Sequence, residues 1–271
     1  MNVLEELDLF YENFGGEKGI IGETELGKPI YFLAVRKTAR PVIIAQYSIH
    51  AREYICTYLA MAQAKDFLES GTRGTVFFIP AANPDGINIA LTKNPLYKAN
   101  ARGVDLNVNF DARWGTGEKN VFKAGTENFV GEKPFSEKET RALREFTLAK
   151  KPNLTISYHS KGEEIYWEFR QNWREAQRDY KIAKAISLCT GYPLKSAGNS
   201  AGGYKDWCIE KLKIPALTIE VGRDELFHPI GKESLAEIYE KNKNVLKTAV
   251  RILGKQRYSE RVKSFNKDKG F

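Results

Sequence analysis

The stretch PVIIAQYSIHAREY, residues 41–54, decides how the rest of this chain is interpreted. It is an apolar, β-branched run that ends on His50, and Glu53 follows three positions later. A short apolar run of this kind is typical of a buried strand in an α/β sheet. The side chains of His50 and Glu53 are either unrelated polar residues or two members of one functional site.

Three further runs share this pattern of an apolar segment that ends on polar or glycine residues. They are TVFFIPAAN (residues 75–83), NLTISYHS (153–160) and ALTIEVG (216–222). Helical patterns, with apolar residues at intervals of three and four, separate or follow these strands. They cover residues 52–68, 136–149, 172–191 and 232–254. With no internal repeat and no Pro/Ser-rich linker, this order predicts one α/β domain.

The second of these helical patterns carries an explicit start signal. Ser136 stands at its beginning and Glu139 follows three residues later. This spacing predicts a capping box, in which each of the two side chains accepts a backbone N–H of the other residue.

Composition fits a folded protein with a sizeable core. The 271 residues are 42% hydrophobic and 28% charged. No apolar run approaches the ~20 residues of a membrane span, so we expect no membrane partner. Residues 1–19 are acidic and lack the basic and apolar regions of a secretory signal. Three widely spaced cysteines do not form a disulfide framework. We therefore expect a cytoplasmic protein.

Half of the net charge of +8 lies at one end of the chain. Residues 254–271 hold six basic and two acidic residues, a net charge of +4. Such a run is typical of a solvated helix and tail, which we expect from about residue 255. The remaining charge could favour anionic ligands. No nucleic-acid motif accompanies it, so we expect no nucleic-acid partner.

Polar side chains stand where the four apolar runs end. His50, Asn83, His159 and Glu220 each fall at or just after the end of one run. In α/β sheets, ligands bind outside the carboxyl ends of the strands. The shared position indicates that these four residues lie near one another.

Two histidines and one glutamate could form a metal site. Catalytic zinc commonly takes three imidazole or carboxylate ligands and leaves a fourth position open. His50 and Glu53, at positions i and i+3 of a helical start, share a face, and His159 ends a later strand. Taken singly, a His-x-x-Glu pair or a strand-end histidine is more often a satisfied polar group than a metal ligand.

The remaining polar candidates have structural alternatives too. Glu220 lies among apolar residues and glycine, so it is either salt-bridged or held at a site as a base. Asp105 could orient a histidine, and Arg102 and Asn107 could meet a carboxylate or an oxyanion. All three could instead be satisfied loop residues.

The order of these motifs resembles the M14 zinc carboxypeptidase family. The order is His50-x-x-Glu53, Asn-Pro-Asp-Gly (83–86), Gly-Val-Asp-Leu-Asn (103–107), His-Ser (159–160) and TIEVG (218–222). The match runs from about residue 20 to about residue 250. It implies a single α/β domain over residues 1–271, with a mixed, largely parallel, eight-stranded sheet flanked by helices.

The resemblance also implies a role for each matching residue. His50, Glu53 and His159 correspond to the ligands of one zinc ion, and Glu220 to the general base. Asp105 corresponds to the acceptor that orients the first histidine, and Asn107 to a residue that binds the substrate carboxylate. For the oxyanion-stabilising arginine of the family we favour Arg102, with Lys98 as the alternative.

Two positions depart from the family pattern. Val108 stands where family members have an arginine that binds the terminal carboxylate, and a valine cannot form that ion pair. Ile209 stands where we align a mobile tyrosine. Both departures argue against ordinary C-terminal trimming of proteins.

The departures resemble one branch of the family, the γ-D-glutamyl-L-diamino acid endopeptidases. The stretches that carry this likeness are NARGVDLNVNF (100–110) and GGYKDWCIEKLKIPALTIEVG (202–222). It implies a zinc peptidase acting on peptidoglycan-derived peptides that contain γ-D-Glu-diaminopimelate. Tyr204, Lys205 or Arg223 could hold the diaminopimelate moiety. The alternatives are a conventional metallocarboxypeptidase and a catalytically silent muropeptide-binding protein.

Overall fold

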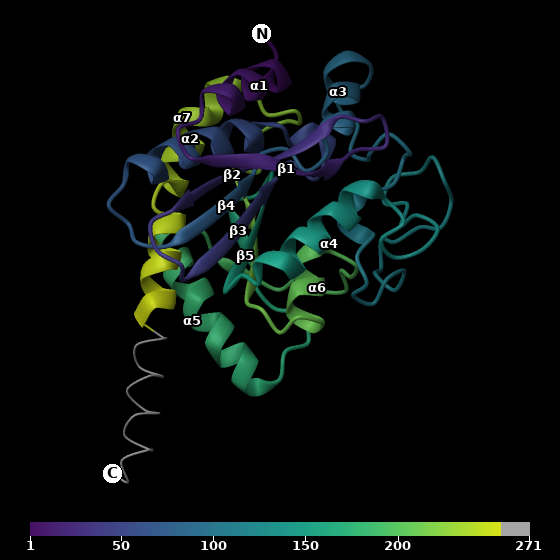
Figure 1. Ribbon diagram of the computed structural model, residues 1–271. Coiled ribbons are helices and arrows are strands. Elements are labelled where there is room, and N and C mark those ends of the chain that lie inside the picture. Colours follow the sequence, from purple (N-terminus) through teal and green to yellow (C-terminus); the bar gives the residue numbers. More distant parts are fainter. Residues whose placement is uncertain (256–271) are drawn as a thin grey trace.

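The computed structural model describes residues 1–255 of the chain, and the basic tail expected beyond them lies outside this range. At its centre is one eight-stranded sheet of order β1-β2-β4-β3-β5-β8-β6-β7 (Figure 1). The strands are β1 Glu17–Glu23, β2 Pro29–Arg36, β3 Val42–Tyr47, β4 Thr75–Ile79, β5 Leu154–His159, β6 Glu164–Tyr166, β7 Leu194–Lys195 and β8 Ala216–Glu220. The expected single α/β domain is confirmed.

The four strands predicted from the sequence form the middle of the sheet. β4, β3, β5 and β8 are neighbours and run parallel, whereas β1, β2 and β6 pair antiparallel with their neighbours further in. β3, β4 and β5 are buried along their whole length. Burial on both faces is why their sequences are continuously apolar instead of alternating.

Helices cover both faces of the sheet, as Figure 1 shows. α1, α2, α5 and α7 pack on one face around one hydrophobic cluster, and α4 and α6 pack on the other around a second cluster. The helices are α1 Val3–Asn13, α2 Ile55–Glu69, α3 Pro84–Thr92, α4 Lys138–Lys150, α5 Trp173–Thr190, α6 Tyr204–Glu210 and α7 Leu235–Asn242, with a last helical segment at 245–255. Within residues 1–255, no helix combines the length and the hydropathy that crossing a bilayer requires.

The predicted capping box at the start of α4 is wrong. The helix is capped by Glu137, which makes no side-chain capping bond. Ser136 Oγ instead donates to Glu137 Oε1 at 2.6 Å. Glu139 is fully buried and accepts from Asn100 Nδ2. A tertiary partner has replaced the local one.

Two predicted helices also have different boundaries. The pattern at 52–68 begins with a separate 3₁₀ turn, η1 (Ala51–Glu53), before α2 starts at Ile55. The pattern at 232–254 comprises the 3₁₀ turn η3 (Lys232–Ser234), then α7, and then the segment at 245–255.

The parallel arrangement brings the carboxyl ends of β3, β5 and β8 to one edge. In this register His159 at the end of β5 is the direct neighbour of Glu220 at the end of β8. His50 follows the end of β3 by three residues. The fold thus places the three segments side by side before any side-chain interaction is considered.

Candidate active site

Donor atoms of three side chains converge at this edge. The Nδ1 atoms of His50 and His159 lie 3.1 Å apart. Glu53 Oε1 lies 2.9 Å from the first of these nitrogens, and Glu53 Oε2 lies 3.0 Å from the second. All three residues are buried. They form a compact set of two imidazoles and one carboxylate whose donor atoms all lie within 4.8 Å of one another.

The backbone after β3 explains how His50 and Glu53 meet. Ser48 adopts a positive φ of 53°, which turns the chain at the end of the strand. His50 then caps the 3₁₀ turn η1 in an extended conformation, and Glu53 ends that turn. Ser48 Oγ donates to the Glu53 carbonyl at 3.2 Å and closes the loop. A short helical turn places positions i and i+3 on one side.

The donor set fits a catalytic zinc site. Zinc bonds of ~2.1 Å at tetrahedral angles separate ligand atoms by roughly 3.4 Å, close to the spacings found here. His50 Nε2 donates to Asp105 Oδ1 at 3.2 Å, so Nδ1 is left to face Glu53 as a ligand would. Two histidines and one carboxylate are a donor set that zinc hydrolases use.

The electrostatics of the donor set favour a cation. Burial alone would lower the pKa of His50, but the carboxylates of Glu53 and Asp105 raise it to about 9. Burial likewise opposes ionisation of Glu53, yet His50 and His159 hold the pKa of this carboxyl well below its usual range. Positive charge is therefore stabilised where the donor atoms meet.

Lys98, and not Arg102, is the basic side chain beside this set. Lys98 Nζ lies 2.7 Å from Asp105 Oδ2 and lines the cavity at the site. The guanidinium of Arg102 instead pairs with Glu132 at 3.3 Å and with Glu137 at 3.5 Å. The expectation that Arg102 serves as the catalytic and substrate-binding arginine is thus wrong. Its backbone lies in the right loop, but its side chain is directed to carboxylates outside the cavity.

Glu220 occupies the position expected of a base. It ends β8 next to His159 and lines the same cavity as His50. Partial burial and the nearby Glu53 carboxylate raise the pKa of Glu220 well above its usual range. A carboxyl group at this position can exchange a proton with a reacting group in the cavity.

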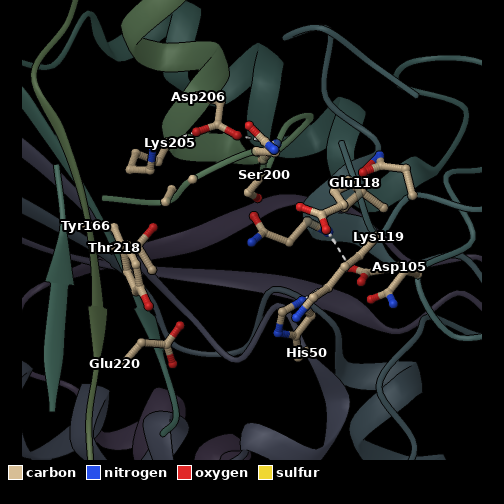
Figure 2. Close-up of a pocket in the computed structure, with 18 of the residues that line it drawn as sticks. His50, Asp105, Glu118, Lys119, Tyr166, Ser200, Lys205, Asp206, Thr218 and Glu220 are labelled. Carbon is tan, nitrogen blue, oxygen red and sulfur yellow. Dashed lines mark hydrogen bonds and ion pairs between the residues drawn. The ribbon is translucent and has the colours of Figure 1, made fainter. Parts of the chain in front are cut away.

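The cavity beside these residues has a volume of about 530 Å³. Figure 2 shows Glu220 and His50 on one side of it, with Lys205 and Asp206 at the opposite end. Lys205 Nζ lies 2.5 Å from Asp206 Oδ1, and both side chains are almost fully buried. A buried pair of opposite charges at the end of a cavity offers one donor group and one acceptor group to a ligand.

Three other sequence-based expectations for the substrate site are corrected. Tyr204 is completely buried and its hydroxyl pairs with Thr147 Oγ1 at 2.7 Å, so its side chain does not reach the cavity. Ile209 is a core residue, so the absence of a tyrosine there says nothing about substrate binding. Arg223 pairs with Glu237 at 3.5 Å and does not line the cavity.

Asn107 and Val108 do line the cavity, as expected for residues that contact substrate. Asn107 Oδ1 accepts from the Tyr204 backbone N–H at 3.2 Å. Several further lining residues were not predicted from the sequence, and two of them are charged residues of one loop. These two are Glu118 and Lys119, which come from an irregular loop with no motif to single them out.

The sequence profile of the zinc carboxypeptidase family, Peptidase_M14, matches residues 16–245. The chain belongs to the M14 zinc carboxypeptidase family. The His50, Glu53 and His159 donor set agrees with the zinc that this family of peptidases uses. The resemblance found in the sequence is confirmed.

Relatives of this M14 peptidase include enzymes named for peptidoglycan peptides. It is 29% identical to gamma-D-glutamyl-L-diamino acid endopeptidase 1 of Lysinibacillus sphaericus, over 82% of this chain and 64% of that protein. It is 28% identical to murein peptide amidase A of Escherichia coli K12, over 80% of this chain and 84% of that protein. The chain thus spans slightly less than two thirds of the first relative's length.

The fold of this M14 peptidase is similar to those of solved carboxypeptidase-like structures. Bovine thrombin-activatable fibrinolysis inhibitor superposes with a TM-score of 0.83 at 19% identity, over 94% of this chain and 98% of that one. Murein-tripeptide amidase from Escherichia coli O157 superposes with a TM-score of 0.66 at 24% identity, over 89% and 95%. At these identities the likeness establishes the architecture alone.

Proposed function

We propose that this enzyme hydrolyses the γ-D-glutamyl–meso-diaminopimelate bond of peptides released from peptidoglycan. The observation that carries the proposal is the charge pattern of the cavity. The wall has the uncharged Val108, and the far end has the buried pair of Lys205 and Asp206. The names of two relatives, an endopeptidase and a murein peptide amidase, support the same substrate class.

The Lys205–Asp206 pair suits the side arm of diaminopimelate. That arm ends in an ammonium and a carboxylate on one carbon atom. Lys205 can bind the carboxylate while Asp206 binds the ammonium. The protein holds both charges in place, because Lys205 Nζ donates to the Glu168 carbonyl at 2.9 Å and Asp206 Oδ2 accepts from the Gly203 N–H at 3.1 Å.

The chain's own residues divide the work of hydrolysis. His50, Glu53 and His159 would hold the zinc ion, which would supply a Lewis acid for the scissile carbonyl and the attacking water. Glu220 accepts the proton of the attacking water and passes it to the leaving amine. Lys98, beside Asp105, stabilises the negative charge that develops on the carbonyl oxygen.

The proposal also concerns the cellular compartment in which the enzyme acts. We propose that the enzyme acts on such peptides in the cytoplasm, because the chain's three cysteines are all free. Free cysteines suit a reduced compartment.

A substrate panel with mass-spectrometric product analysis tests the proposal. Purified zinc-loaded protein should release diaminopimelate from L-Ala-γ-D-Glu-meso-diaminopimelate and leave blocked L-dipeptides intact. Preferential cleavage of the L-dipeptides would indicate a conventional carboxypeptidase. Bound zinc without turnover of either class would indicate a binding protein.

A substitution of the base completes this test. Glu220→Gln should lower kcat by about a thousandfold, because the neutral amide cannot accept a proton, while zinc content stays at one ion per chain. Glu145→Gln, on the exposed face of α4, serves as the matched control and should retain full activity. Full activity in Glu220→Gln would refute the assigned base.

A further inference from the structure

A second cavity lies directly against the first. It has a volume of about 510 Å³ and is lined by residues from segments 113–118, 168–176 and 196–201. Glu118 and the five residues Ser196–Ser200 line both cavities. A single strap of chain therefore forms their common wall, and the Glu118 backbone N–H donates to the strap at Asn199 O, 3.1 Å away.

The two cavities also meet at the Lys205–Asp206 end. Lys205 Nζ donates to the backbone carbonyl of Glu168 at 2.9 Å and lies 5.4 Å from the centre of the Phe169 ring. Glu168 and Phe169 line the second cavity. A ligand held at Lys205 is therefore at the border of the second cavity.

Within residues 1–255, one of the two arginines that line the second cavity has no carboxylate partner. Arg113 is paired with Glu210 at 3.2 Å. The guanidinium of Arg170 makes no ion pair with a carboxylate among residues 1–255, and Arg170 is solvent-exposed. The acidic residues of the lining are Glu118 and Glu168. Arg170 is thus the group that is available to an anionic ligand.

We propose that the second cavity binds the residue that follows the diamino acid in the substrate, with Arg170 contacting its terminal carboxylate. This inference rests on the proposed function. Val108 removes the need for a free carboxylate next to the scissile bond, so the chain can continue past the diamino acid. The zwitterionic side arm then occupies the Lys205–Asp206 end, and the main-chain branch enters the second cavity. Arg170 becomes a specificity-determining residue for tetrapeptides over tripeptides.

The test compares three substrates. They are the tripeptide L-Ala-γ-D-Glu-meso-diaminopimelate, the tetrapeptide with one more D-alanine, and the same tetrapeptide with its C-terminal carboxyl amidated. Wild-type enzyme should cleave the tetrapeptide with kcat/KM about tenfold above that for its amide, which corresponds to the loss of one charge-assisted contact.

Arg170→Ala should remove this difference. It should lower kcat/KM for the tetrapeptide about tenfold through KM, leave the amide unchanged, and leave the tripeptide within about twofold of wild type. Arg174→Ala, an exposed arginine of α5 that lines neither cavity, is the matched control and should change nothing.

Three results would overturn the inference. One is cleavage of the tripeptide alone by the wild-type enzyme, which leaves the proposed function intact. Another is an equal effect of Arg170→Ala on the tetrapeptide and its amide. The third is cleavage of none of the three substrates, in which case the proposed function fails as well.

Discussion

At the scale of single residues, Glu139 is a carboxyl group away from the zinc donors whose pKa the fold raises. It lies fully buried in the first turn of α4. Asn100 Nδ2 donates to its Oε2 at 3.3 Å. Its Oε1 has no hydrogen-bond partner within the described part of the chain. Burial, with a smaller effect of the neighbouring Glu137 and Glu25 carboxylates, raises the pKa of Glu139 to about 7.

The raised pKa predicts that stability falls as pH rises. Between about pH 4.5 and pH 7 the unfolded chain has released this proton, whereas the folded chain still holds it. The free energy of unfolding therefore declines over this window, by at most about 3 kcal/mol. Glu139→Gln keeps the shape of the side chain and removes its titration. The free energy of unfolding of this variant, measured in urea, should therefore decline less between pH 5 and pH 8 than that of wild type.

A control variant separates this effect from general titration. Glu132→Gln removes an exposed carboxylate of similar chemistry, and its pH dependence should match wild type. The prediction is contradicted if Glu139→Gln shows the same decline as wild type.

At the scale of elements, a buried polar network connects α2 to the strands that carry the two histidines. Tyr47 OH donates to Gln63 Oε1 at 2.6 Å, and Gln63 Nε2 donates to Tyr158 OH at 3.1 Å. The rings of Tyr47 and Tyr158 stack with their centres 4.6 Å apart. These tyrosines stand at or near the ends of β3 and β5, just before His50 and His159. The network therefore fixes the strand ends from which the zinc donors project.

A double-mutant cycle should reveal this network. Gln63→Leu leaves two buried hydroxyls without partners and should cost about 2–4 kcal/mol in the free energy of unfolding. With Tyr47→Phe in the same chain, the combined loss should be smaller than the sum of the single losses by about 1 kcal/mol, because one orphaned hydroxyl has gone. Urea unfolding measures all four variants, and strictly additive losses would show that the two groups are not coupled.

Elements in the middle of the sheet were predictable, and those at its edges were not. Strands β3, β4, β5 and β8 are buried, so continuous apolar runs mark them in the sequence. β1 and β2 are partly exposed and form an irregular antiparallel pair with a register shift near Ile20. β6 and β7 are only three and two residues long. Short or half-exposed strands have no periodicity strong enough to stand out.

At the scale of the whole molecule, zinc should stabilise the folded chain. The donors come from the turn after β3 and from the end of β5, segments that are far apart in the unfolded chain. A ligand that binds only the folded state adds about 2.7 kcal/mol at a hundredfold excess over its Kd. Removal of zinc with EDTA should therefore lower Tm by roughly 5–10 °C, as measured by calorimetry.

The matched control removes one donor and keeps the side chain's size. His159→Gln should melt at the same temperature with and without EDTA. A shift in this variant as large as that of wild type would locate the stabilising metal elsewhere in the molecule.

The sequence by itself determined the fold class, the family and the three residues of the donor set, and the role of Glu220 as the base stays a prediction. It could do so because strand-end positions and motif order depend on the chain alone. Only the tertiary structure decided which basic side chain stands at the donor set. Arg102 and Lys98 lie in one loop, and both side chains are long and flexible. Arg102 pairs with Glu137, whereas Lys98 pairs with Asp105. The tertiary structure also decided that Lys205, Asp206 and residues 196–200 line the cavities. These positions depend on contacts between distant segments, which no local sequence pattern predicts.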